Sequence, residues 1–277
     1  MKLLGELRLI SEFSAVTCGP GGGKIERIKV PFYHGEAEFA ESDLDGLLVT
    51  GDLQFYDRKD VPEKDRILMG YIVSQEIAEL CDAALLPPRD KIAAILTGDM
   101  YAIPSLLERG GLGDVDDVWL QFADDFRWVA GVAGNHDYFS GKAEFSGTLL
   151  RESNIYPLDG DLIEVDGLKI GGISGISGNP SKAWRYADAE FITNFKQLCF
   201  ESIDIMILHQ GPIGQVRGQR GFGLINELIR GAKSPPALVT FGHCWWPDPV
   251  SDEGGATLLN VDGGVVLLTR PGANLQL

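Results

Sequence analysis

The chain has 277 residues, of which 40 are acidic and 24 are basic, so its formal net charge is −16. Hydrophobic residues make up 44% and charged residues 23%, which is typical of folded globular proteins and excludes a disordered chain. The net charge argues against a protein that follows a nucleic-acid backbone by electrostatic attraction. An acidic protein can still bind a phosphate ester where a metal ion supplies positive charge locally.

The sequence also argues against membrane insertion and secretion. The longest apolar runs, such as 93–96 and 265–268, have the length of a strand and are too short to span a bilayer. Glu6 and Arg8 interrupt the N-terminal segment, which therefore lacks the apolar core of a signal peptide. The four cysteines lie far apart and form no CxxC pair, which favours free thiols in a reducing compartment. We therefore expect a cytoplasmic protein with no membrane partner, and the sequence does not indicate its oligomeric state.

The first half of the chain alternates short apolar runs with helical patterns, which predicts an α/β fold. A glycine-rich loop at 18–24 lacks the Ser or Thr that follows lysine in a phosphate-binding loop, so a hairpin loop is expected there. A helix is expected from about Asp60, which can cap it, with Pro62 in the first turn. The acidic stretch at 114–125 is expected to be the solvated face of a helix. Strands are expected at 46–50, 91–97 and 127–132.

The second half repeats this alternation. Strands are expected at 168–173, 203–208 and 237–241, and helices at 187–198 and 223–230. The segments 257–261 and 265–268 are expected to form a terminal hairpin, with Asp262, Gly263 and Gly264 in its turn. Because no linker, repeat or low-complexity tract interrupts the chain, a single domain covering residues 1–277 is predicted.

Polar side chains follow five of the expected strands. They are Asp52, Asp99, Asn135, His209 and His243. Ligands of open α/β sheets bind beyond the carboxyl ends of the strands, so these side chains are candidates for one site. Three of only four histidines in the chain fall at these strand ends, the third being His136. Carboxylate, amide and imidazole donors without a thiolate cage suit Mn²⁺, Fe or Zn²⁺.

The motifs at these strand ends are similar to those of the calcineurin-like metallophosphoesterases. They are Gly98-Asp99, Gly134-Asn135-His136-Asp137, His209 and Gly242-His243, and they occur in the family's order. Together with Asp52 they span residues 51 to 243, most of the chain. The resemblance implies an α/β fold with two mixed β-sheets packed as a sandwich and flanked by helices. It also implies a metal-dependent hydrolase of phosphoric esters that uses a metal-bound hydroxide.

The resemblance also implies a role for each matching residue. Asp99 would bridge two metal ions, and Asn135, His209 and His243 would complete the second metal site. Asp52 and Gln54 would belong to the first. The catalytic pair would be His136 and Asp137: His136 would approach the substrate phosphate and protonate the leaving oxygen, and Asp137 would help to orient it.

Two departures from the family pattern fall on the first metal site. The chain has Asp52-Leu53-Gln54 where the family has Asp-x-His, and Gly242-His243-Cys244-Trp245 where the family has Gly-His-x-His. Gln54 can still offer a neutral amide oxygen, whereas the indole of Trp245 offers a metal nothing. We therefore expect two metal sites, with the first one weakened.

The sequence leaves two classes of function open. The leading interpretation is an enzyme that hydrolyses a small phosphate ester, either a monoester or a diester, with Mn or Fe as the favoured cofactor and Zn not excluded. The alternative is a metal-binding, phosphoesterase-like protein with weakened or lost catalysis that acts as a binding or regulatory module. A nuclease is a further alternative, which the acidity of the chain disfavours.

Overall fold

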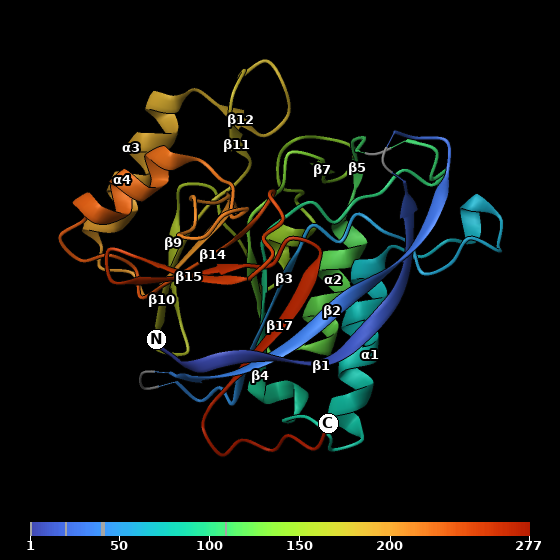
Figure 1. The fold of residues 1–277 in the computed structure, drawn as a ribbon, viewed down its shortest axis with the longest axis horizontal. Helices are drawn as coiled ribbons and strands as arrows, with labels where there is room; N and C mark the ends of the chain where they lie inside the picture. The colour runs from blue at the N-terminus through green and yellow to red at the C-terminus, as the bar shows by residue number, and fades with distance from the viewer. Residues whose placement is uncertain (1, 20, 40–41, 109) are drawn as a thin grey trace.

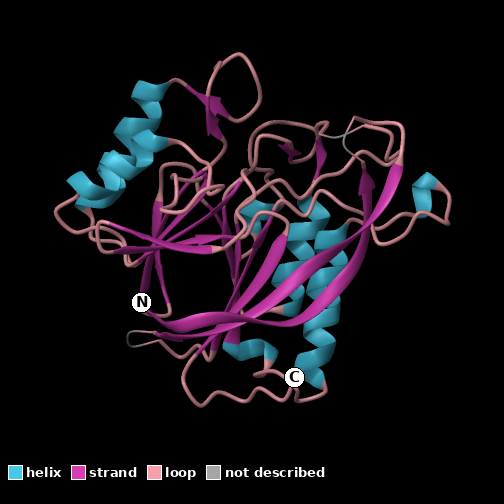
Figure 2. Ribbon diagram, viewed as in Figure 1, coloured by secondary structure: helices cyan, strands magenta, loops and turns pink. Residues whose placement is uncertain are grey.

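The computed structural model describes residues 2–19, 21–39, 42–108 and 110–277. Two mixed β-sheets pack face to face, and helices cover the outer side of each sheet (Figure 1). The helices lie in two groups on opposite sides of the strands (Figure 2). The α/β sandwich expected from the sequence is therefore confirmed. Across the described part of the chain, no helix combines the length and apolar character needed to cross a membrane.

The first sheet has seven strands in the order β1-β2-β17-β3-β4-β6-β8. They are β1 (Lys2–Cys18), β2 (Ile25–Glu38), β3 (Gly46–Gly51), β4 (Ile92–Leu96), β6 (Val129–Gly131), β8 (Ile155–Pro157) and β17 (Gly264–Thr269). Strands β3, β4, β6 and β8 run parallel to one another. Strands β1 and β2 form a long antiparallel hairpin. The loop expected at 18–24 is the turn of that hairpin, although Pro20 lies outside the described residues.

The second sheet has six strands in the order β15-β16-β14-β13-β10-β9. They are β9 (Leu162–Val165), β10 (Leu168–Ile173), β13 (Ile205–Gln210), β14 (Leu238–Gly242), β15 (Val250–Glu253) and β16 (Ala256–Asn260). Two short pairs join β5 (Gly113–Asp114) to β7 (Asp137–Tyr138) and β11 (Ile176–Ser177) to β12 (Arg185–Tyr186).

The helices pack on the outer faces of the two sheets. They are α1 (Met69–Asp82), α2 (Asp116–Asp125), α3 (Asp188–Phe200) and α4 (Gly223–Gly231), with 3₁₀ turns at Glu63–Asp65, Arg89–Lys91 and Leu149–Arg151. The helix expected from Asp60 begins later, at Met69. The reason is that a bridge between Tyr56 and Leu68 closes residues 57–67 into a loop before the helix starts.

Alternation along the strands separates the core into layers. In β13, Ile205 and Ile207 pack into the cluster between the sheets, whereas Met206 and Leu208 pack with α3 and α4. Strand β3 alternates in the same way between the central cluster and the cluster under α1 and α2. Successive side chains of a strand point to opposite faces, so a sheet covered on both sides has continuously apolar strands.

The expected terminal hairpin is wrong. Strand β16 pairs in parallel with β14 in the second sheet, whereas β17 lies between β2 and β3 in the first sheet. Residues 261–263 therefore carry the chain from one sheet to the other. This crossing places Asp262 beside the end of β3, where the two backbones form a bridge between Gly51 and Asp262.

The acidic helix α2 is less solvated than expected. Asp116 and Asp125 are buried, and each accepts hydrogen bonds from serine hydroxyl groups. Ser74 on α1 donates to Asp125, and Ser146 donates to Asp116. These two carboxylates therefore fasten α2 to its neighbours, while Asp117 faces solvent as expected.

Candidate metal centre

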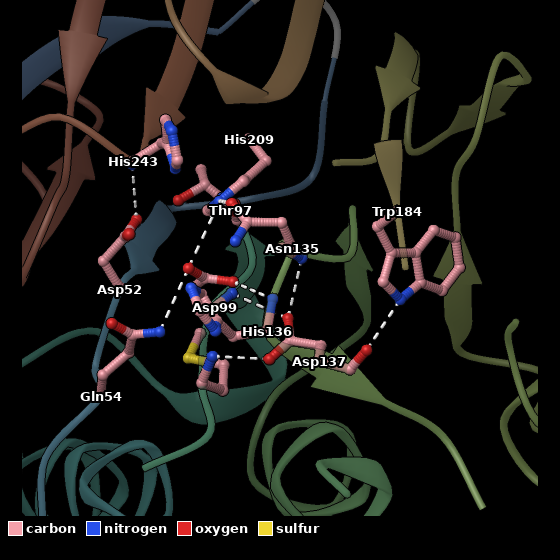
Figure 3. A network of polar contacts seen from close by, with 12 residues as sticks. Asp52, Gln54, Thr97, Asp99, Asn135, His136, Asp137, Trp184, His209 and His243 are labelled. Carbon is pink, nitrogen blue, oxygen red and sulfur yellow. Dashed lines mark hydrogen bonds and ion pairs between the residues drawn. The ribbon is translucent and has the colours of Figure 1, made fainter. Parts of the chain in front are cut away.

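Three residues that follow strands share an uncommon backbone conformation. Asp52 after β3, Asp99 after β4 and His243 after β14 have φ angles of 52°, 55° and 66°. Positive φ is uncommon outside glycine and is often concentrated at functional sites, where the surrounding structure enforces it. The strand ends of both sheets are therefore locally shaped to turn these side chains toward one another (Figure 3).

Asp99, His209 and His243 form a group that could hold a metal ion. A carboxylate oxygen of Asp99 and one ring nitrogen of each histidine all lie within 4.8 Å of one another. Asp99 is 3% exposed and His209 is fully buried, whereas His243 is half-buried. One carboxylate oxygen with two imidazole nitrogens is a donor set that first-row divalent ions accept. The residues present therefore fit a divalent metal ion.

The orientation of His209 leaves one ring nitrogen available for a metal. Nδ1 lies 2.8 Å from the carbonyl oxygen of Thr97, and because a carbonyl can only accept, Nδ1 carries the proton. Nε2 lies 3.5 Å from Oδ2 of Asp99 and 3.3 Å from Oδ1 of Asn135. A carbonyl partner on the far nitrogen is the usual support of a metal-binding histidine. Asn135 is thus positioned to add its amide oxygen to the group.

Opposing effects set the protonation of these residues in the metal-free chain. Burial lowers the pKa of His209, but the Asp99 and Asp52 carboxylates and the Thr97 carbonyl together outweigh burial and raise that pKa to about 10. Burial tends to raise the pKa of Asp99, but the His209 imidazolium lowers it overall. Burial and then the charge of His209 lower the pKa of His243 to about 4, so His243 is neutral at pH 7. A metal ion bound here would take the place of the proton on His209.

Asp52 and Gln54 contact two members of the metal group, His243 and Asp99. Oδ2 of Asp52 accepts a hydrogen bond of 2.9 Å from the backbone N–H of His243, which links β3 of the first sheet to β14 of the second. Burial, then the charge of Asp262, raise the pKa of Asp52 well above its usual range. The side-chain nitrogen of Gln54 donates to Oδ2 of Asp99 over 3.2 Å. In this orientation Gln54 presents to Asp99 the amide end that cannot bind a metal.

His136 lies beside the metal group and is held from two directions. Its backbone N–H donates to Oδ1 of Asp99 over 2.9 Å. Its Nδ1 lies 2.8 Å from the carbonyl oxygen of Gly111, so Nδ1 carries a proton and Nε2 is left for a ligand. Gly110 packs against the ring so closely that an added Cβ would lie 2.9 Å from Cε1 of His136.

Asp137 differs from expectation, because its carboxylate binds backbone rather than the ring of His136. It accepts hydrogen bonds from the N–H groups of Asp99, Met100 and Gly134, at 2.7, 2.9 and 2.8 Å. Burial, then the charge of Asp99, raise the pKa of Asp137 to about 6. The carbonyl of Gly111 orients the imidazole instead, and Asp137 fixes the turns after β4 and β6. Sequence patterns of side chains give no signal for a backbone carbonyl such as this one.

A cavity of about 450 Å³ opens at this centre. Asp52, Gln54, Asp99, His136 and His243 line it, together with apolar side chains from Phe55, Ile103 and Leu106. Trp245 also lines the cavity and is 61% exposed, so its indole lies at the rim. The cavity therefore joins a polar centre to an apolar wall.

Asp262, which the sequence predicts only as a turn residue, also lines this cavity. Burial raises its pKa to about 6, and the nearby Asp99 carboxylate adds to that rise while His209 opposes it. Asp262 follows the apolar run of β16 just as Asp52 follows β3, so the signal that found the other strand-end residues applies to it as well.

Comparisons with known proteins support the fold alone. No family model and no curated protein matches the chain. The crystal structure of TT1561 of Thermus thermophilus matches with a TM-score of 0.53 at 14% identity, covering 79% of this chain and 91% of that chain. A hypothetical protein from the same organism matches with a TM-score of 0.45 at 13% identity, covering 79% and 76%. The first likeness agrees with the sandwich architecture.

Proposed function

We propose that the protein is a metal-dependent hydrolase of phosphoric esters. The observation that carries the proposal is the double use of Asp99. One of its oxygens belongs to the metal-binding group, and the other holds the backbone of His136, which places an imidazole at the edge of that group. A metal ion beside a positioned acid or base is an arrangement suited to hydrolysis of phosphate esters.

The residues that would hold the ion are Asp99, His209 and His243, with Asn135 as a further donor. When bound, a divalent ion lowers the pKa of water and withdraws charge from phosphoryl oxygens. His209 is suited to this task because Thr97 fixes the tautomer in which Nε2 faces Asp99. Manganese or iron suits this mixture of oxygen and nitrogen donors, and zinc is an acceptable substitute.

His136 would act on the leaving group. Because Gly111 binds Nδ1, a protonated ring can offer only Nε2–H to a ligand in the cavity. Transfer of that proton to the leaving oxygen of an ester would avoid release of an alkoxide. The substrate would be a small ester, since the cavity holds about 450 Å³ and the acidic chain disfavours a nucleic acid.

Two observations favour the alternative of a metal-binding protein with weakened catalysis. Gln54 turns its amide nitrogen toward Asp99, and Trp245 supplies no metal donor, so a single ion at the histidines is the simplest occupancy. Such a protein would bind phosphate esters without turning them over. Its role would then be binding or regulation.

The test is turnover with and without metal. The purified chain is stripped with a chelator, reloaded with Mn²⁺, Fe²⁺ or Zn²⁺, and assayed on bis(4-nitrophenyl) phosphate and 4-nitrophenyl phosphate. We expect hydrolysis of at least one ester that is lost with the metal and regained with it. A chain that binds an ion tightly but hydrolyses neither ester with any metal would favour the binding module.

A further inference from the structure

The crossing between β16 and β17 brings one more carboxylate to the metal centre. Asp262 forms a parallel bridge with Gly51, and the N–H of Gly263 donates to the carbonyl of Gly51 over 3.1 Å. Gly51 directly precedes Asp52. The backbone at 262 is therefore tied to the same strand end that carries Asp52, although the two residues are 210 positions apart.

Asp262 shares the cavity with Asp52 and Gln54, the two residues that the sequence predicts at the first metal site. Asp52, Gln54, Asp99 and Asp262 all line it. Within the described residues, no hydrogen bond or ion pair engages the side chain of Asp262. A turn residue of structural importance would normally bind backbone N–H groups with its carboxylate, as Asp137 does.

Asp52 gives independent reason to expect a cation. It is 8% exposed, its Oδ2 accepts one hydrogen bond from His243, and its Oδ1 accepts none from the described part of the chain. A carboxyl group at this depth needs a compensating partner in order to ionise, and a bound cation is such a partner. No lysine or arginine in the described residues forms an ion pair with Asp52, Asp99 or Asp262.

From this geometry we infer that Asp262 is a ligand of an additional metal position, the one expected from the sequence as the first site, which it forms with Asp52 and Gln54 next to the ion at Asp99, His209 and His243. Gln54 would join through its amide oxygen after a half-turn of the amide group. The donors of this position are then all oxygens, which Mn²⁺ and Mg²⁺ accept and which thiophilic ions do not favour. Asp262 thereby supplies a ligand in a cavity where Trp245 supplies none. The inference rests on the metal-binding part of the proposed function.

Ion counting tests this inference without reliance on activity. Metal-free wild type is dialysed against Mn²⁺, and bound manganese per chain is measured by mass spectrometry and by electron paramagnetic resonance. We expect two ions in the wild type and one in Asp262→Asn, with affinity for the second ion at least about tenfold weaker. Asp252→Asn, which removes an exposed carboxylate from β15, is the matched control and should bind two ions.

The outcomes separate this inference from the proposed function. Two ions bound by Asp262→Asn with wild-type affinity would overturn the inference, and so would a wild type that holds one ion which Asp262→Asn retains. A wild type that binds no ion would overturn the metal site itself. A measurement on the wild type guards against misfolding of the variant: excess Mg²⁺ should displace one Mn²⁺ of the two. Displacement of both ions, or of neither, would contradict an oxygen-only position beside a histidine position.

Discussion

The backbone N–H of His136 donates a hydrogen bond of 2.9 Å to Oδ1 of Asp99, so one carboxylate joins the proposed proton donor to the metal group. The other oxygen of Asp99 lies 3.5 Å from Nε2 of His209. A change at Asp99 should therefore affect metal binding, while the hydrogen bond to His136 can be kept by any residue with an acceptor at the same place.

Asp99→Asn tests this division. Asparagine tolerates the φ of 55° and can still accept from His136, but it removes the charge that attracts the ions. We expect metal affinity to fall more than about 100-fold, with loss of both ions from the purified chain, because the role expected for Asp99 is to bridge the two positions. Mass spectrometry measures the metal content and circular dichroism checks the fold. Asp117→Asn, which changes an exposed residue on α2, is the control, and a full metal complement in Asp99→Asn would show that Asp99 is structural.

His136→Ala should separate turnover from metal binding. We expect a fall of roughly 10²- to 10⁴-fold in kcat with the metal content unchanged, since the role proposed for His136 is that of a proton donor and not of a ligand. The fall should be smaller for a 4-nitrophenyl ester than for an alkyl ester, because 4-nitrophenolate leaves without a proton. Equal losses on both esters would argue against general acid catalysis, and loss of metal would argue for a ligand role.

A glycine pair tests whether the position of the His136 ring matters. Gly110 and Gly141 have φ angles of 78° and 77°, so alanine at either position carries a similar backbone strain of about 1–3 kcal/mol. An added Cβ at Gly110 would meet Cε1 of His136, whereas at Gly141 nothing lies within 4 Å. We expect similar losses of Tm in both variants, but at least about a tenfold loss of kcat only in Gly110→Ala. Equal kcat values in the two variants would show that the ring tolerates displacement.

The expected strands that the structure reproduces are those buried on both faces. All five residues of β4 are buried, and the strand ends one residue before the expected limit. The edge strand β1 was not expected, because its first eleven residues are exposed or half-buried and include several charges. Apolar runs identify central strands, while an exposed hairpin has no apolar run to find.

Local turn chemistry explains the error at the end of the chain. Asp262-Gly263-Gly264 suits a hairpin turn, but the same residues also allow a chain to cross between two packed sheets. The choice depends on which strands offer free edges, and that is a property of the whole fold. The single-domain assignment of residues 1–277 stays a prediction.

The candidate site divides in a similar way. The residues that the sequence singled out at strand ends are brought together, including Asp99, His209 and His243. The contact between the His136 ring and the carbonyl of Gly111 could not be predicted. Every residue has a main-chain carbonyl, and the sequence does not indicate which one will accept the hydrogen bond. Asp262 was missed because its turn role gave a sufficient local explanation.

The stability of the fold at low pH should depend on an ion pair that links the two sheets. Asp166, between β9 and β10, accepts hydrogen bonds from Nε and Nη2 of Arg127 and from Nε1 of Trp128. The Arg127 bonds lower the pKa of Asp166. A lowered pKa stabilises the fold fully above the unfolded value of about 3.9, and this contribution is lost as the pH falls below that value. The side chains of Asp166 and Arg127 are 16% and 32% exposed, so water screens part of their attraction.

Asp166→Asn should therefore lower the free energy of unfolding by about 1–3 kcal/mol at pH 7. Asparagine tolerates the φ of 48° at this position, so the substitution tests charge rather than backbone strain. Urea unfolding at pH 7 and at pH values below about 3.9 measures the difference, which should shrink toward zero in acid. The exposed Asp161→Asn is the control, and a difference independent of pH would show that the ion pair is not its source.

The central claim is that Asp99, His209 and His243 hold a divalent ion at the meeting point of the two sheets. Crystals of the metal-free protein soaked in Mn²⁺ test it directly, through an anomalous difference map recorded at the manganese absorption edge. We predict a strong peak within bonding distance of a carboxylate oxygen of Asp99 and of one ring nitrogen of each histidine, with a second peak nearer Asp52 and Asp262. A well-ordered crystal with no anomalous peak at these three residues would contradict the account.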